Sequence, residues 1–159
     1  LAVSLKLQDE LLARGYQVLM VRETNRVNIS NSKRAAIAGQ AGADVFVRIH
    51  ANGSDDPSDT GSMTICPTPA NPYCGGNCRA SRRLSDCILD HMTASSRFKS
   101  NGVRETDTMS GINWSQVPVT IVEMGYMSNR DEDLKMVSDS CQRRIVQGIA
   151  AGIDAYCGR

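Results

Sequence analysis

Two residues with side chains suited to catalysis stand at the ends of short apolar runs. His50 ends the run VFVRIH, and Glu123 ends the run VTIVE. Imidazole is a common zinc ligand, and a carboxylate nearby can act as a further ligand or carry a proton. Both residues also have a plain structural interpretation, in which His50 is a satisfied strand-end histidine and Glu123 pairs with an arginine. The residue types alone allow a hydrolytic site without deciding for it.

The cysteines point to a different kind of chemistry. Six are present, an even number that suits disulfides in an exported protein, whereas buried free thiols are the alternative. Cys66, Cys74 and Cys78 lie close together in the sequence, and at least one disulfide is expected among them. A zinc site at these three cysteines is the less favoured alternative, because no histidine lies near. Cys141 and Cys157 should not pair, since a helix would hold them ~24 Å apart.

Hydrophobic spacing predicts the scaffold that positions these residues. Helices are expected over residues 1–14, 30–41, 78–92 and 140–156, strands over 17–21, 45–50, 61–66 and 119–123, and segment 101–110 is ambiguous between strand and loop. Strands separated by helices predict an α/β fold whose mostly parallel, twisted sheet is flanked by helices on both faces. Sites in such sheets lie beyond the carboxyl ends of the strands, so His50 and Glu123 are expected to face one crevice.

Length and charge narrow the class of protein. The 159 residues, 41% of them apolar, suit a single domain over residues 1–159. A net charge of +1, from 18 basic and 17 acidic residues, argues against a nucleic-acid partner. No apolar run approaches the ~20 residues needed for a transmembrane segment. The chain starts at Leu1, at a point that the helical spacing places inside a helix, so residues upstream of it are expected.

Two longer motifs resemble those of a known enzyme family. Residues 43–52, AD followed by VFVRIHAN, resemble the AD-x-FVSIHAN segment of the zinc-dependent N-acetylmuramoyl-L-alanine amidases of the amidase-3 family. Residues 117–129, VPVTIVEMGYMSN, are similar to that family's PAVLVELGFLSN. Weaker matches follow in order along essentially the whole chain, at GYQV with VR, at Arg34 with Ala38, at Gly61-Ser62 and in the closing helix. The resemblance implies an amidase-3-like fold and a peptidoglycan hydrolase.

The resemblance also implies roles for particular residues. It makes His50 a ligand of a zinc ion (Zn2+) and Glu123 the catalytic carboxylate, which together activate water to cleave the amide between N-acetylmuramic acid and L-alanine. In such enzymes a His and a Glu from earlier in the chain complete the metal site. This sequence opens in the middle of that region, and Glu10 lies too far along its helix to substitute. The domain is therefore expected to be N-terminally incomplete, with both ligands upstream of Leu1.

Two further residues are candidates for contacting substrate. Asn52, just after His50, would touch substrate or support a ligand, and Trp114 would stack on a sugar unless it only anchors its loop. His91 is expected on a solvated helix face. The motif departures at 61–63 and 101–103 leave the other substrate contacts open. The expected partner is peptidoglycan, and the expected state is a monomer outside the cell or at the cell wall.

Two alternatives to the amidase remain at this stage. One is a catalytically inactive module of the same fold that binds the cell wall or regulates another protein. The other is a zinc peptidase that acts on the stem peptide with similar acid–base chemistry.

Overall fold

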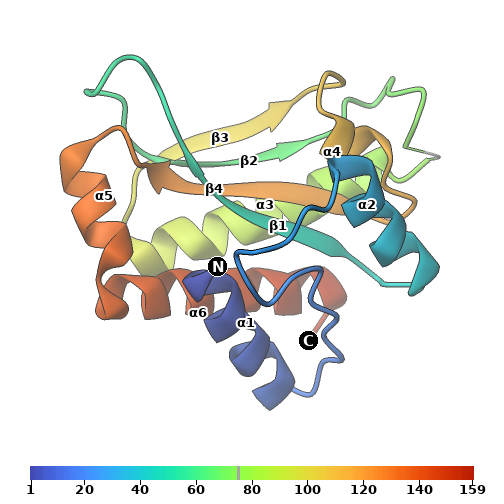
Figure 1. Cartoon of the computed structure of the whole chain (residues 1–159), viewed down its shortest axis with the longest axis horizontal. Coiled ribbons are helices and arrows are strands. Elements are labelled where there is room, and N and C mark those ends of the chain that lie inside the picture. The colour runs from blue at the N-terminus through green and yellow to red at the C-terminus, as the bar shows by residue number, and fades with distance from the viewer. Residues whose placement is uncertain (75) are drawn as a thin grey trace.

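A single four-stranded sheet forms the centre of the computed structural model, which describes residues 1–74 and 76–159 (Figure 1). Its strands are β1 (Phe46–Asn52), β2 (Ser62–Cys66), β3 (Ser100–Glu105) and β4 (Val119–Tyr126). Their order across the sheet is β1-β4-β2-β3, with β1 parallel to β4, β2 parallel to β3, and β2 antiparallel to β4. The expected α/β fold with a mostly parallel sheet is confirmed, and segment 101–110 contributes an edge strand.

Helices cover both faces of this sheet. They are α1 (Ala2–Ala13), α2 (Asn31–Gln40), α3 (Cys78–Ser96), α4 (Ser110–Asn113), α5 (Arg130–Val137) and α6 (Asp139–Cys157). Val122 of β4 points into a core shared with α3 and α6, against which α1 also packs. Its neighbour Ile121 points into a second core shared with α2 and α4. The alternation along β4 thus gives each face its own core.

Side-chain caps explain where several helices begin. The hydroxyl of Ser30 accepts a hydrogen bond from the backbone N–H of Lys33 at the start of α2. The side chain of Asn129 accepts one from the N–H of Glu132 at the start of α5, where three acidic residues also favour the positive end of the helix dipole. The two helices lie at opposite ends of the sheet, as Figure 1 shows.

The helices α3 and α6 approach each other closely along two glycines. A Cβ atom at Gly148 would lie 2.5 Å from the Cα of Met92, and one at Gly152 would lie 2.5 Å from the Cα of Ile88. Both distances are far inside van der Waals contact, so these backbones can touch only because the α6 positions carry no side chain. The two helices therefore lie closely side by side, with α3 against the sheet.

The sequence expectations fail at two places. Residues 17–21, expected as a buried strand, are irregular, and Leu19 is 59% exposed. An apolar run forms a strand only when another strand accepts its backbone hydrogen bonds, and within the described residues no strand pairs with this segment. The charged helix α5 was not anticipated, because its sequence RDEDLKMV has no continuous apolar stripe.

The expected disulfide is present between Cys74 and Cys78, while Cys66 is a buried free thiol. A zinc site at these three residues is therefore not supported. Cys141 and Cys157 do not pair with each other, as expected.

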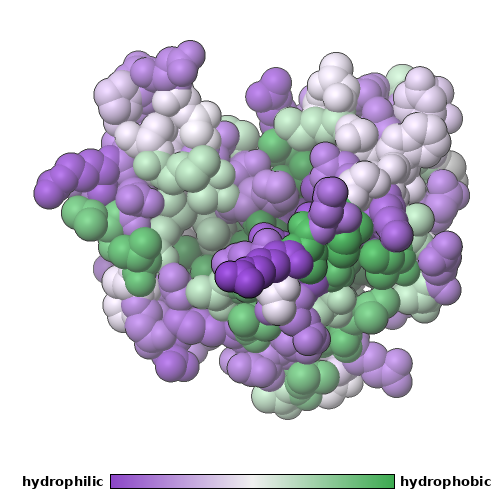
Figure 2. Space-filling view, viewed as in Figure 1, coloured by the Kyte–Doolittle hydropathy of each residue, from purple (hydrophilic) through white to green (hydrophobic). Residues whose placement is uncertain are grey.

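The surface seen in Figure 2 is mostly polar, with apolar residues gathered over α5 and over β1 beside the N-terminal segment. Among the described residues, none of the helices combines the length and apolar character that crossing a membrane requires.

Candidate active site

The structure brings His50 and Glu123 together at the carboxyl ends of two neighbouring strands. His50 of β1 is the register partner of Glu123 of β4, and the two strands run parallel. Register partners in a sheet direct their side chains to the same face, here the face that carries α2 and α4. The juxtaposition expected from the strand ends is therefore observed, while the roles of the two residues stay predictions.

Glu123 holds a carboxylate oxygen with no hydrogen-bond partner. The residue is half-buried, and its Oε2 atom is fully buried and unpaired within the described part of the chain. Burial raises the pKa of this carboxyl group, and the positive charge of Arg48 partly opposes the rise. A buried acceptor without a donor is costly in a folded protein unless another group uses it. Glu123 is thus the carboxyl group best placed to accept a proton or a ligand.

Arg48 borders the same site, although the sequence analysis did not single it out. It lies two residues before His50 on the same face of β1, and its Nη2 donates a hydrogen bond to the Oδ1 of Asn31 at 2.7 Å. A Cβ atom at Gly111 would lie 1.6 Å from Nη1 of Arg48, so the absence of a side chain there gives the guanidinium its room. The alternation within VFVRIH already places this arginine on the face of His50.

The surroundings of His50 favour its neutral form. Desolvation lowers the pKa of this histidine to about 4, and the positive charges of Arg48, Arg34 and Arg22 act in the same direction. The residue is nevertheless exposed at its outer edge. A neutral imidazole is also the form of histidine that can bind a metal ion.

The described residues do not form a complete metal site by themselves. Across residues 1–74 and 76–159, no group of three His, Cys, Asp or Glu side chains lies close enough together to hold a metal ion. A catalytic zinc takes three protein ligands and leaves its fourth position open. One imidazole beside one unpaired carboxylate oxygen fits a fraction of that arrangement, and the remaining ligands have no source within these residues.

Comparison with known proteins decides the family. A family model described as N-acetylmuramoyl-L-alanine amidase, Amidase_3, matches residues 1–155. The chain belongs to the amidase-3 family. It is 32% identical over 156 residues to the uncharacterized protein YqiI of Bacillus subtilis (strain 168), which covers 98% of this chain and 71% of that protein. It is 28% identical to the N-acetylmuramoyl-L-alanine amidase LytC of the same strain, covering 98% of this chain but 30% of LytC.

Solved structures agree with the amidase-3 fold. The catalytic domain of CwlV, an N-acetylmuramoyl-L-alanine amidase from Bacillus (Paenibacillus) polymyxa var. colistinus, superposes with a TM-score of 0.87 at 25% identity, over 99% of this chain and 82% of that one. The amidase Ami1 from Mycobacterium smegmatis gives a TM-score of 0.89 at 24% identity, over 98% and 74%, which shows the fold alone. The family match supports a hydrolase of cell-wall peptidoglycan.

The other predicted residues of this amidase-3 domain lie around the site or away from it. Asn52 shapes the turn after β1, because its Oδ1 accepts a hydrogen bond from the N–H of Gly53 at 2.9 Å and its carbonyl accepts one from Met127 at 2.8 Å. His91 is exposed on α3, as expected. Trp114 ends α4 and is 54% exposed, away from the strand ends that carry His50 and Glu123.

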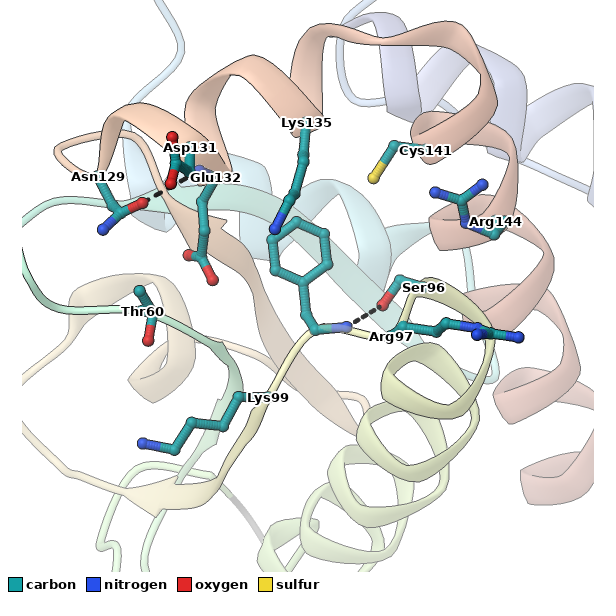
Figure 3. A pocket seen from close by; sticks show the side chains of 11 residues that line it. Thr60, Ser96, Arg97, Lys99, Asn129, Asp131, Glu132, Lys135, Cys141 and Arg144 are labelled. Atoms are coloured by element: carbon teal, nitrogen blue, oxygen red, sulfur yellow. Dashed lines mark hydrogen bonds between the residues drawn. The ribbon is translucent and has the colours of Figure 1, made fainter.

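A cavity of about 480 Å³ lies elsewhere in the amidase-3 domain (Figure 3). Figure 3 shows Glu132 and Lys135 entering it from α5, and Cys141 and Arg144 from α6. The carboxylate of Glu132 accepts hydrogen bonds from the N–H groups of Gly61 and Tyr126, both at 2.8 Å. The walls of the cavity come from α3, α5 and α6, on the other face of the sheet from His50. The hydrogen bonds of Glu132 give it a structural role, in which it holds two backbone segments together.

Proposed function

We propose that this amidase-3 domain hydrolyses the amide bond between N-acetylmuramic acid and L-alanine in peptidoglycan, in a zinc-dependent reaction. The observation that carries the proposal is the register pairing of His50 with Glu123, whose Oε2 is buried and unpaired. The names of LytC and CwlV as N-acetylmuramoyl-L-alanine amidases support the choice of bond. No other carboxylate in the described residues combines a strand-end position, burial and an unused oxygen beside a histidine.

His50 is proposed as one zinc ligand, with the remaining ligands supplied by residues outside this sequence. Zinc, when bound, supplies Lewis-acid polarisation of the amide carbonyl and acidifies water. The contribution of this chain is an imidazole that the surrounding arginines and desolvation keep neutral.

Glu123 is proposed as the general base. Its unpaired Oε2 would accept the proton of the attacking water, and the carboxyl group would then pass that proton to the departing amine of L-alanine. Burial moves the pKa of Glu123 upward, which makes the carboxylate a better proton acceptor, while Arg48 limits the rise.

The place of action is proposed as the cell wall, outside the membrane, with the protein acting as a monomer. A disulfide between Cys74 and Cys78 supports an exported protein, because such bonds persist in oxidising compartments. The substrate follows from the family, whose relatives are named for a bond found in peptidoglycan.

A digest of purified peptidoglycan tests the proposed function. The protein as its gene encodes it should release new free L-alanine amines, without new reducing sugar ends and without free D-alanine. Release of D-alanine would replace the amidase with a stem-peptide peptidase. Binding without any cleavage, in protein shown to contain zinc, would replace it with a cell-wall-binding or regulatory module.

A further inference from the structure

Two aromatic side chains stand exposed next to each other on the surface. Tyr73 is 52% exposed and Trp114 is 54% exposed, and their ring centroids lie 6.1 Å apart with the planes tilted by 34°. They come from loops 41 positions apart in the sequence, one after β2 and one at the end of α4. Half-exposed rings contribute little to the core, and two neighbouring rings offer a flat apolar surface to a ligand.

A polar network fixes the backbone of the two loops that carry the rings. Asn71 is buried, and its Oδ1 accepts hydrogen bonds from the N–H groups of Tyr73 at 2.8 Å and Cys74 at 3.1 Å. Its Nδ2 donates to the Oδ1 of Asn113 at 2.9 Å, and Asn113 directly precedes Trp114. The disulfide to Cys78 holds the same loop from its other side. The loops are therefore ordered before any ligand arrives, which reduces the entropy lost on binding.

The surface next to Trp114 combines an apolar wall with polar groups at its rim. A shallow hollow of about 420 Å³ is lined by Trp114, Ala36, Ser32, Lys33 and Gln116. Sugars present one face of C–H groups that stacks on an aromatic ring and a rim of hydroxyls that need hydrogen-bonding partners. The hydroxyl of Ser32, the ammonium of Lys33 and the amide of Gln116 supply such partners around the ring of Trp114.

The exposed aromatic area is too small for a stable contact with a second copy of the chain. Tyr and Trp side chains present ~150–250 Å² each, and about half of each is exposed here, so the pair offers ~200 Å². A stable dimer needs about 800 Å² from each partner. The polar residues around the rings also suit a ligand rich in hydroxyl groups better than an apolar protein face.

We infer that Tyr73 and Trp114 form a stacking surface for sugar rings, which binds the glycan strand of peptidoglycan at a distance from the bond that is cleaved. The inference rests on the proposed function for the identity of the glycan. Trp114 precedes β4, and the four residue steps from Val119 to Glu123 alone span ~13 Å along that strand. A ligand that reaches both places is longer than one sugar, as a glycan strand is.

Binding of a peptide-free glycan tests this surface without requiring cleavage. The protein as its gene encodes it is titrated with a β-1,4-linked N-acetylglucosamine oligomer, by calorimetry and by the fluorescence change of Trp114. Trp114→Ala and Tyr73→Ala should each weaken binding roughly 10-fold, as expected for one lost stacking contact of about 1.4 kcal/mol. Tyr73→Phe keeps the ring and should stay within about twofold. Leu134→Ala, which removes a side chain of similar exposure (53%) on α5, should have no effect.

A kinetic comparison separates this surface from the catalytic residues. Trp114→Ala should raise KM for polymeric peptidoglycan and leave kcat unchanged, and it should not alter cleavage of a single disaccharide-peptide. Equal oligomer affinity in wild type and Trp114→Ala, or binding of a stem peptide alone at this surface, would overturn the inference. Ring-dependent oligomer binding by a protein that releases no L-alanine amines would support the inference and overturn the proposed function instead.

Discussion

The two strands that carry the candidate catalytic residues have similar sequences and very different surroundings. In β4, residues 119–122 are all buried, whereas β1 is half-buried along most of its length. The difference follows from position, because β4 pairs on both edges while β1 pairs on one within the described residues. Both segments form strands because their sequences are apolar, but the number of neighbouring strands determines how deeply each strand is buried.

This difference divides the site into a fixed half and an open half. Glu123 lies on the best-buried strand of the sheet, which fixes the position of its backbone. His50 lies at the edge, beside arginines from β1, α2 and the N-terminal segment, and has an exposed side. The proposed base is thus buried beside an accessible imidazole, which suits a reaction on a polymer that must approach from outside.

The largest effect on activity is expected from a substitution at Glu123, on the buried strand. Glu123→Gln keeps the shape of the side chain but removes its ability to accept a proton, so kcat for peptidoglycan cleavage should fall roughly 10²–10⁴-fold with fold and zinc retained. Glu105→Gln, the same change on β3 of the same sheet, is the matched control and should keep near-full activity. Turnover of Glu123→Gln within a few-fold of wild type would remove this residue from the mechanism.

A substitution at His50, in the exposed part of the site, should change how much zinc the protein binds. His50→Ala should lower zinc affinity by at least ~10-fold, because one of about three protein ligands is lost. His91→Ala removes the other histidine, which is exposed on α3, and should leave zinc content unchanged. Zinc measured by elemental analysis after dialysis gives the result, and equal zinc in both variants would place the metal elsewhere.

A polypeptide of residues 1–159 alone tests whether these residues are sufficient for zinc binding and for activity. They contain no group of three ligands in their described part, so we expect weak zinc binding, no amidase activity and reduced stability. Tight stoichiometric zinc together with full activity in this polypeptide would show that the ligands have been assigned wrongly.

A matched pair of substitutions tests the difference in burial directly. Ile121 of β4 is 4% exposed, and Ile49 of β1 is half-buried. Ile121→Ala should lower the free energy of unfolding by ~2–5 kcal/mol, and Ile49→Ala by roughly half as much, since less area leaves water at the edge strand. Urea unfolding measures both, and equal losses would mean that β1 is covered as completely as β4 in solution.

The smallest effect is expected where polar contacts hold α1 in place. Burial opposes ionisation of Asp154 on α6, but hydrogen bonds from Tyr16 and Arg14 outweigh it and lower the pKa of this carboxyl group below its ordinary value. Its stabilisation is therefore present above the unfolded pKa of ~3.9 and is lost as pH falls through the folded value. Hydrogen exchange should show α1 opening on acidification before β4 does, and Asp154→Asn, costing about 1 kcal/mol, should show it already at neutral pH. Simultaneous opening of both elements would contradict this.

Local patterns predicted the elements that carry the site and missed features that depend on distant contacts. The apolar runs ending at His50 and Glu123, and the helices near 78–92 and 140–156, follow directly from hydrophobic spacing. The run at 17–21 has the same spacing but no strand beside it, which a local pattern cannot reveal.

Two functional candidates were missed for separate reasons. Arg48 interrupts an apolar run, and only the alternation along β1 shows that it shares a face with His50. Tyr73 meets Trp114 because Asn71 and a disulfide join two loops, and sequence spacing carries no sign of that meeting. The unmatched oxygen of Glu123 likewise emerges only once the packing around it is known.

The close contact of α3 with α6 has a consequence for how this protein can change. At Gly148 and Gly152 the atoms of α3 that a larger side chain would meet belong to the backbone. A second substitution that shortens a neighbouring side chain therefore cannot make room for it. Elsewhere in a core, one enlargement can be offset by one reduction nearby. A saturation library at these two positions should therefore return glycine almost alone, and revertants of Gly148→Val should restore the original codon rather than arise at second sites.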